Sequence, residues 1–520
     1  MKDVKVHAVR ILCASLAASA IVAAGPGLSG QIPPYGGAAE LRADLAARRA
    51  KAMAALGPET VLVAFSAPTR VYSADVDYEY RQDSNLLYLT GITQEETILV
   101  LIPGAKTAKE IIFTRDPEPR REHWEGHTLS PVEVTAASGI TDHFPLPTFE
   151  QFMEGLLAGS PMYVHHRTPA SDLDGKAEWA TFIAAVKAGK ARLGILERVG
   201  PQAGGRGAAP NQPFTPAPGS RAAWAMDLAA KYPGVTPFNA TSIVTTLRQV
   251  KTPYEQKVLK RSVEISAEAH LEGMKAARPG RWEYEVEAAI EYWYLKNGAM
   301  SWGYPSIVGS GPNATILHYG ASSRQMKDGD LLLVDAAGNF QGLTGDITRT
   351  YPVNGRFTPA QREIYELVLR AQEAGMAAAK LGAPTNGIAQ ACRAVFTEGL
   401  LKLGLITAAD PAQVSRWATH GPTHGIGVDV HDPLGQTLVA GSAFVIEPGL
   451  YIREAALNQL PRTPENDQFI QKVRPMVQKY KDIGVRIEDS FLMTEQGLVR
   501  LSTKAPRLVV EIEKVVGTGK

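Results

Sequence analysis

Five side chains that commonly bind metal ions stand in order along the second half of this chain, each in or beside a short apolar stretch. Asp335 ends LLLVD, Asp346 lies in GDITRTYPV, and His424 lies in a glycine-rich segment. Glu447 follows in VIEPGLYI and Glu488 in GVRIEDS. Four carboxylates and one imidazole suit two divalent cations that share bridging carboxylates, unlike all-cysteine or all-histidine sets. A fold that uses this set must bring distant strands together at one place.

The second half of the chain also repeats one order of elements. Apolar periodicity, prolines near helix starts and glycines after helix ends predict helices, and short apolar runs predict strands. The first set is expected at 253–277, 282–295, 331–336 and 346–353, and the second at 359–403, 442–446 and 485–494. The order helix, helix, strand, strand therefore occurs twice, which predicts two similar α+β halves that close over one site.

The carboxylates each have a simpler explanation that must be weighed. Asp335 could cap a turn after its strand. Asp346 favours a site instead, because the two aspartates can face each other across an antiparallel pair, and facing carboxylates repel unless a cation or a shared proton lies between them. Glu447 and Glu488 are expected on buried strands, where an unpaired carboxylate is costly. Arg486 shares a strand face with Glu488 and is placed to orient a metal ligand.

Three histidines, His420, His424 and His431, lie in one glycine-rich stretch. The intervening Gly421-Pro422 excludes a helix between the first two. A lone histidine on an apolar segment is more often structural than a ligand. Three of them beside several glycines favour a binding site, because the backbone can approach a ligand closely there.

Other motifs indicate no further chemistry. Residues 309–314, GSGPNA, imitate a dinucleotide-binding loop, but Pro312 and the following Thr-Ile-Leu do not begin an amphipathic helix. Ser310 has no Gly-x-Ser-x-Gly surroundings, so a serine hydrolase is not indicated. Cys392 lies on a predicted helix face, which indicates a buried structural thiol rather than a nucleophile.

Length and composition bound the organisation of the chain. A chain of 520 residues exceeds one ordinary core, so we expect two domains. Residues 38–230 alternate short strands with helices and predict an α/β N-terminal domain, in which the Gly/Pro-rich segment 199–220 is expected to be a flexible loop. The second domain is expected over 238–515. Lys and Arg total 54 against 53 Asp and Glu, so no basic excess indicates a nucleic-acid partner.

The first residues have the pattern of a secretory signal peptide. Three basic residues precede an apolar run over 11–24, which is too short to span a bilayer and ends in small residues suited to cleavage. We therefore expect residues 1–24 to be removed and the protein to be exported, to a periplasm or beyond, without a membrane anchor. Removal of Cys13 would leave Cys392 alone and exclude an internal disulfide.

These motifs resemble the aminopeptidase P and prolidase family, the pita-bread metallopeptidases related to methionine aminopeptidase. The likeness covers nearly the whole mature chain. It rests on YRQDSN and LYLTG in residues 80–91, on ILHY in 316–319, on the two aspartate strands and the histidine stretch, and on EPG in 447–449 and RIED in 486–489. The resemblance implies an α/β N-terminal domain of aminopeptidase P type, followed by an α+β pita-bread (creatinase/aminopeptidase) catalytic domain with internal pseudo-symmetry.

The resemblance also assigns the metal ligands. Asp335 would bind one ion alone, and Asp346 and Glu488 would bridge both ions. His424 and Glu447 would complete the second ion, with a bridging water or hydroxide as the nucleophile. Mn²⁺ is the expected metal, and Zn²⁺, Co²⁺ and Fe²⁺ remain alternatives.

Further roles follow by the same resemblance. His318 and His431 match positions that bind substrate and help to stabilise the tetrahedral intermediate, and His420 matches another active-site histidine. Glu447 is the expected proton shuttle to the leaving nitrogen, and Arg486 a supporting residue of the site. Trp124 matches a loop that in relatives reaches a neighbouring subunit's active site, and an ordinary packing tryptophan is the alternative. A homo-oligomer, dimer or tetramer, is expected.

The leading hypothesis is an Xaa-Pro aminopeptidase, which releases the N-terminal residue from peptides with proline in second position. A prolidase, restricted to Xaa-Pro dipeptides, is the nearest alternative. A non-catalytic pita-bread binding protein or a metal-independent creatinase-like hydrolase is disfavoured, because the sequence retains all five ligand types.

Overall fold

The computed structural model describes residues 33–159, 163–164, 173–197 and 219–519. The expected signal peptide at 1–24, with Cys13, lies outside the described residues, as does nearly all of the predicted loop at 199–220. Among the helices that are described, none combines the length and apolar character that crossing a bilayer requires.

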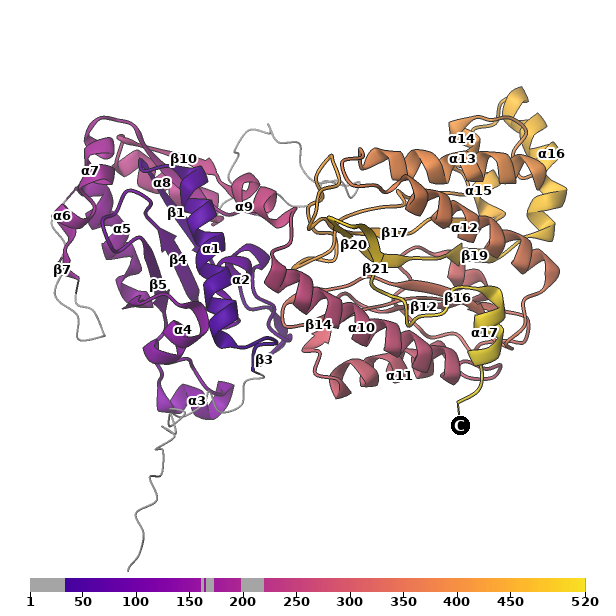
Figure 1. The fold of residues 1–520 in the computed structure, drawn as a ribbon, viewed down its shortest axis with the longest axis horizontal. Coiled ribbons are helices and arrows are strands. Elements are labelled where there is room, and N and C mark those ends of the chain that lie inside the picture. Colours follow the sequence, from indigo (N-terminus) through magenta and orange to yellow (C-terminus); the bar gives the residue numbers. More distant parts are fainter. Residues whose placement is uncertain (1–32, 160–162, 165–172, 198–218, 520) are drawn as a thin grey trace, which may run out of the picture. The chain divides into compact units, whose positions relative to one another are not determined.

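A mixed sheet organises the N-terminal domain (Figure 1). Its strand order is β10 (Val235–Asn239), β9 (Ala191–Ile195), β1 (Thr60–Phe65), β4 (Thr97–Leu101), β5 (Glu110–Thr114) and β6 (Asp142–Pro145). β1 runs parallel to β9 and antiparallel to β4. β1 and β4 are among the short strands that the sequence predicts for residues 38–230. β10 follows residue 230, where we expected the domain to end, and it belongs to this sheet because it pairs with β9.

Helices cover both faces of this sheet, which explains why its central strands are apolar along their whole length. One face packs against α1 (Ala38–Leu56) and α2 (Ser84–Thr90), and the other against α5 (Phe149–Ala158), α7 (Ala180–Lys187) and α8 (Arg221–Lys231). The remaining elements are peripheral: β2 (Val71–Ser73), β3 (Val76–Asp77), α3 (Pro119–Glu125), α4 (Pro131–Ser138), η1 (Leu146–Thr148), β7 (Tyr163–Val164), β8 (Leu173–Asp174), α6 (Gly175–Glu178) and α9 (Thr241–Arg248).

The C-terminal domain contains the predicted repeat of helices and strands. In each half a pair of packed helices is followed by antiparallel sheets. The first half consists of α10 (Pro253–Ala276), α11 (Glu283–Lys296), β11 (Ser301–Trp302), β12 (Ile307–Ser310), η2 (Gly311–Thr315), β13 (Leu331–Asp335), β14 (Gly338–Phe340), β15 (Leu343–Thr344) and β16 (Thr348–Pro352). The second consists of α12 (Pro359–Ala378), α13 (Asn386–Lys402), α14 (Pro411–Val414), β17 (Ala443–Ile446), β18 (Gly449–Ile452), α15 (Ala455–Asn458), α16 (Pro464–Lys479), β19 (Ile483–Arg486), β20 (Asp489–Thr494) and β21 (Gly497–Arg500), and α17 (Val509–Val515) follows.

The two halves begin with the same local device. Thr252 and Thr358 each cap a long helix with the side-chain oxygen, and a proline follows at the first helical position. Glu255 and Gln361 in turn accept a hydrogen bond from the backbone N–H of the capping threonine, so each helix start is a complete capping box. These starts agree with the helices expected from residue 253 and residue 359.

One predicted strand is two strands in the structure. The sequence predicts a single strand over 485–494, but β19 ends at Arg486 and β20 begins at Asp489. The strand is interrupted there because the two pieces pair with different partners, β19 with β18 and β20 with β17. Glu488 therefore lies at a junction between two ladders rather than inside a strand.

Candidate metal centre

The first two carboxylates lie at the ends of paired strands. Asp335 is the last residue of β13, and the antiparallel register places it opposite Thr348 of β16. Asp346 precedes β16 by two residues, so the aspartates are close but are not a direct cross-strand pair. The hydroxyl of Tyr304 lies within hydrogen-bond distance of both, 2.7 Å from Asp335 Oδ1 and also against Asp346 Oδ1. The sequence predicted that the two aspartates face each other across an antiparallel pair. They instead approach each other at the end of that pair, where Tyr304 connects them.

The two glutamates lie in matching gaps of the second half. Glu447 separates β17 from β18, and Glu488 separates β20 from β19. Ile446 pairs with Asp489 on one side of the gap, and Gly449 pairs with Arg486 on the other. The two ladders therefore hold both glutamates at the same level of the sheets.

Direct hydrogen bonds connect the two halves at this point. The backbone N–H of Glu488 donates to the Thr348 carbonyl at 3.1 Å, and the Thr348 hydroxyl donates to Glu488 Oε2 at 2.7 Å. Ser490 accepts from the Asp346 N–H at 3.0 Å and donates to the Asp346 carbonyl at 2.7 Å. The start of β16 is thus fixed against the junction between β19 and β20.

His424 completes the cluster. Its Nε2 lies 3.5 Å from Asp346 Oδ2, 3.4 Å from Glu447 Oε1 and 4.0 Å from Glu488 Oε1. One ligand atom each from Asp346, His424 and Glu488 can be chosen so that all lie within 4.8 Å of one another. Asp335 adjoins this group through Tyr304. All five side chains that the sequence singled out as metal ligands are therefore brought together.

The electrostatics of the cluster favour a cation. Burial, followed by the charge of a neighbouring carboxylate, raises the pKa of Asp346, Glu447 and Glu488 well above the usual range. Glu488 is 1% exposed, and its Oε1 has no hydrogen-bond partner among the described residues. Buried carboxylates that repel one another and retain a free lone pair fit divalent metal ions, which oxygen-rich sites prefer.

Asp335 differs from its neighbours. Burial opposes its ionisation, but the Arg486 guanidinium and the Tyr304 hydroxyl outweigh that effect and lower its pKa. Arg486 Nη2 lies 2.6 Å from Asp335 Oδ2, while its other nitrogens donate to Tyr451 at 2.7 Å and to Thr348 at 3.0 Å. Arg486 thus supports the ligand Asp335, whereas Glu488, which we expected on the same strand face, lies beyond the end of β19.

Two of the predicted active-site histidines, His420 and His431, lie beside the cluster. His420 Nδ1 lies 3.4 Å from Glu447 Oε2, and its Nε2 bonds the Tyr451 hydroxyl at 2.8 Å. The rings of His424 and His431 meet edge to face at 4.3 Å between centroids. Burial, then the Arg486 charge, lowers the pKa of His420 to about 4, so this imidazole is neutral at physiological pH.

Comparison with known proteins places this geometry in a family. A model of metallopeptidase family M24 matches residues 257–495, and a model of the aminopeptidase P N-terminal domain matches residues 45–165. The Xaa-Pro aminopeptidase of Escherichia coli (strain K12) is 31% identical over 487 residues, which cover 91% of this chain and 98% of the relative. The chain belongs to the Xaa-Pro aminopeptidase family.

Solved structures agree with this membership. The structure of Pseudomonas aeruginosa aminopeptidase PepP matches with a TM-score of 0.72 at 30% identity, covering 91% of this chain and 97% of that one. The human Xaa-Pro dipeptidase is 32% identical, but over 55% of this chain and 64% of the relative. The likeness to Xaa-Pro aminopeptidases therefore extends over the N-terminal domain as well. The predicted fold, an α/β domain followed by a pita-bread metallopeptidase domain, is confirmed.

Several residues that shape the Xaa-Pro aminopeptidase site were missed from the sequence. Tyr304 bridges two carboxylates, yet it lies in SWGYPS, which resembles neither a strand end nor a ligand motif. Thr348 and Tyr451 connect Arg486 to the cluster. Tyr451 could have been found from the sequence, because it lies in VIEPGLYI, the same motif as Glu447.

A buried charged network that the sequence did not reveal holds the loop before His431. Arg248 forms ion pairs with Asp429, at 2.6 Å, and with Asp432. The N-terminal domain contributes Ser84, whose hydroxyl donates to Asp429 Oδ1 at 2.7 Å. The YRQDSN segment of that domain thus contacts the loop that carries a predicted substrate-binding histidine.

Two other surface features bear on the site predictions. Trp124, on α3, is 79% exposed, so it is not an ordinary packing residue within the described part of this chain.

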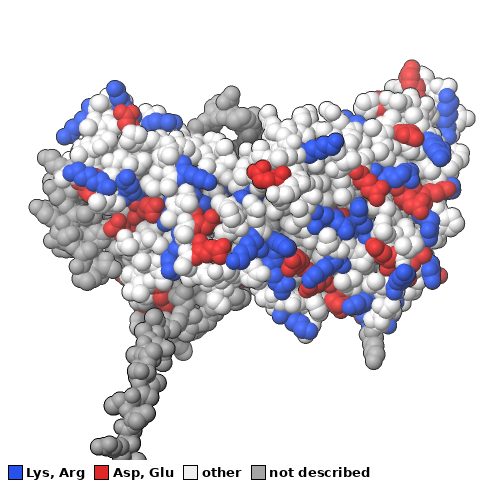
Figure 2. All heavy atoms as spheres, in the orientation of Figure 1, with Lys and Arg blue, Asp and Glu red and all other residues white. Residues whose placement is uncertain are grey.

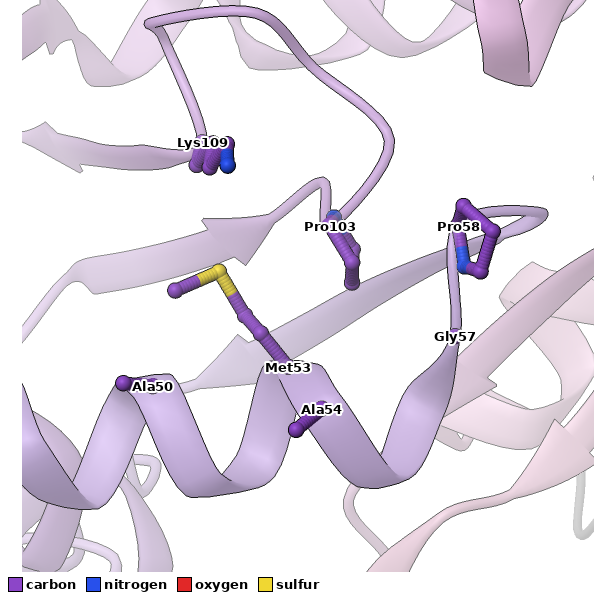
Figure 3. A pocket seen from close by; sticks show the side chains of 7 residues that line it. All are labelled: Ala50, Met53, Ala54, Gly57, Pro58, Pro103 and Lys109. Atoms are coloured by element: carbon purple, nitrogen blue, oxygen red, sulfur yellow. The ribbon is translucent and has the colours of Figure 1, made fainter.

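A hollow of about 350 Å³ lies on the N-terminal domain beside α1, lined by Ala50, Met53, Ala54, Gly57, Pro58, Pro103 and Lys109 (Figure 3). Lys109 is the titratable group in its lining, so this hollow offers no metal ligands. Basic and acidic side chains are interspersed on the face that Figure 2 displays.

Proposed function

We propose that this protein is a dinuclear-metal aminopeptidase that hydrolyses Xaa-Pro bonds and releases the N-terminal residue from peptides with proline in second position. The observation that supports this most strongly is the convergence of Asp335, Asp346, His424, Glu447 and Glu488 in a chain that covers 98% of a bacterial Xaa-Pro aminopeptidase. Family M24 is a family of metallopeptidases, which fits the donor set of this site.

The donor set suggests how the metal would be held. By the family resemblance, Asp346 and Glu488 would be shared by two ions, Asp335 would bind one of them, and His424 and Glu447 would bind the other. When bound, such ions lower the pKa of a water and polarise a carbonyl. Arg486 keeps Asp335 ionised and oriented, and the Thr348 hydroxyl fixes one oxygen of Glu488.

The chain's own residues would manage binding and proton movement. Glu447 lies between His420 and His424, at 3.4 Å from each, so its carboxylate is placed to pass a proton to the leaving nitrogen. His318 and His431 are exposed and would contact the substrate. In an Xaa-Pro bond the leaving nitrogen carries no hydrogen, because it belongs to the proline ring, which also fixes φ. This nitrogen must therefore gain a proton as the bond breaks.

Hydrolysis of a peptide series tests the proposal. The metal-loaded protein should release the first residue from Xaa-Pro-Xaa tripeptides, and Asp346→Ala and His424→Ala should reduce this to the background rate. His127→Ala and Asp467→Ala, at surface ion pairs, are matched controls and should keep full activity. Cleavage of Xaa-Pro dipeptides alone would identify a prolidase, and retained activity in both site variants would refute the mechanism.

We also propose three finer properties. Mn²⁺ is the native metal, which the carboxylate-rich donor set supports, although an E. coli relative has been solved in a zinc-substituted form. The protein is exported after cleavage near residue 24, which the basic and apolar pattern of residues 1–24 supports, and mass spectrometry of the mature N-terminus tests it. It forms a dimer or tetramer, which the exposed Trp124 supports and light scattering tests.

A further inference from the structure

Glu283, the first residue of α11, is a fully buried carboxylate outside the metal centre. It accepts hydrogen bonds from five donors among the described residues. Its Oε1 accepts from the Ser310 N–H at 2.6 Å, the Ser310 hydroxyl at 2.7 Å and Asn313 Nδ2 at 3.2 Å. Its Oε2 accepts from the Tyr319 hydroxyl at 2.9 Å and the Arg324 N–H at 3.0 Å. A carboxylate is an acceptor-only group and can satisfy this many donors at once.

All five donors belong to one segment, residues 310–324, which carries His318 between two of its attachment points. The segment overlaps residues 309–314, the motif that imitates a dinucleotide-binding loop. Its glycines serve a tight turn instead, since Gly311 has a φ of +54° and a Cβ at Gly309 would lie 2.8 Å from the Asn313 carbonyl. The anion that this loop binds is therefore the protein's own Glu283.

The opposite side of the segment packs against the catalytic ribbon of β18 and β19. Tyr451 belongs to a small apolar cluster with Ala314 and Leu333, and Leu317 and Tyr319 pack against that cluster. This is the Tyr451 whose hydroxyl contacts both His420 and Arg486. The neighbours of His318 on both sides are thus held against a residue of the site.

A glycine makes this close packing feasible. A Cβ at Gly484 of β19 would lie 2.0 Å from the Ala314 carbonyl, so η2 can approach the ribbon only because that position has no side chain. The segment is therefore held between Glu283 on one side and the ribbon on the other, with the exposed His318 at its tip.

We propose that Glu283 is a positioning residue for the peptidase site, which holds the segment 310–324 in the conformation that presents His318 to the substrate. The proposal rests on the proposed function. Glu283 acts through the segment and touches neither the metal ligands nor the substrate. Buried networks of satisfied hydrogen bonds make a loop rigid, which is what a substrate-binding side chain on a loop requires.

A double-mutant cycle tests this coupling. In Glu283→Gln the amide nitrogen would face the Arg324 N–H, a second donor, so the arm next to His318 should be released. We expect kcat/KM for an Xaa-Pro-Xaa tripeptide to fall by about ten- to a hundredfold, because small misplacements of binding groups are costly. In a His318→Ala background, Glu283→Gln should lower kcat/KM by less than about twofold. The proposal would be overturned if Glu283→Gln lowered kcat/KM by the same factor with and without His318.

A milder pair of variants guards against misfolding. Tyr319→Phe removes one hydrogen bond to Glu283 and keeps the ring in its apolar cluster, so it should reduce kcat/KM by several-fold in the wild-type background only. Tyr365→Phe is the matched control, because it removes a buried hydroxyl that donates to the Arg507 carbonyl at 2.7 Å, remote from His318. Equal losses in the two variants would mean that Glu283 and Tyr319 have a general structural role.

Hydrogen exchange gives a readout that does not depend on activity. The N–H of Arg324 donates to the oxygen that becomes an amide nitrogen in Glu283→Gln, so it should exchange faster in that variant. The Ser310 N–H keeps an oxygen acceptor and should change less, and the amides of α12 should remain protected. An inactive wild-type protein would refute the proposed function, and this measurement would still decide whether Glu283 holds the segment. Unchanged exchange with an active wild type would refute the positioning role alone.

Discussion

Arg486 donates a hydrogen bond to Asp335 at 2.6 Å, and this contact separates Asp335 electrostatically from the other carboxylates of the site. The guanidinium lowers the pKa of Asp335, whereas burial and mutual repulsion raise the pKa of Asp346. Two adjacent carboxyl groups whose pKa values shift in opposite directions are characteristic of functional sites. Asp335 is therefore ionised before any metal binds, whereas Asp346 needs a nearby cation to ionise.

Replacement of Arg486 by lysine should weaken metal binding although the charge is kept. A lysine ammonium cannot reach Asp335, Tyr451 and Thr348 together as the planar fork does. We expect about ten- to a hundredfold lower metal affinity, measured by metal titration with activity as a second readout. Arg474→Lys, in a surface pair with Glu454, is the control. Unchanged affinity would contradict a supporting role for Arg486.

Glu488→Gln should have opposite effects on stability and on metal binding. The substitution removes a buried carboxyl group that the metal-free protein must keep protonated at a cost, and whose Oε1 lacks a partner among the described residues. The metal-free variant should therefore exceed the metal-free wild type in free energy of unfolding by on the order of 1–3 kcal/mol. Added metal should stabilise the wild type but not the variant. Calorimetry at pH 7 with and without metal measures both effects. A less stable metal-free variant would argue against repulsion among these carboxylates.

Metal binding should release protons, and its affinity should rise with pH. In the metal-free protein Asp346, Glu447 and Glu488 have raised pKa values, so the native state retains protons that the unfolded chain loses above about pH 4. Its free energy of unfolding should therefore fall as pH rises through those native pKa values. His424, with a pKa lowered to about 3, releases none at neutral pH. Calorimetric titration in two buffers of different ionisation enthalpy counts the protons, and a count of zero would refute this prediction.

Cys392 should be inert in the native protein. It is buried on α13, its Sγ lies 3.2 Å from the Ala371 carbonyl, and burial raises its pKa to about 12. We expect no reaction with a thiol reagent at pH 8 until the chain is denatured, because the thiolate is the reactive form. A Cys13→Ser background removes the second thiol from the assay. Rapid labelling of native protein would show that α13 opens locally.

The sequence predicted the residues that lie on regular elements better than those that act across the fold. The helix starts at Thr252 and Thr358 are local capping patterns, and Asp335 is recognisable because an apolar strand ends at it. Tyr304 could not be found in this way, since it acquires its role only when β11 and β13 bring it beside two aspartates. The same is true of Arg248, whose partners Asp429 and Asp432 lie about 180 residues away along the chain.

The break of the β-ribbon at Glu488 has a consequence for biosynthesis. The last ligand of the cluster is fixed by Thr348 of the opposite half. A nascent chain therefore has no complete set of donors until residue 488 has left the ribosome. The full donor set can hold metal ions only after both halves of the domain have been synthesised and have folded together.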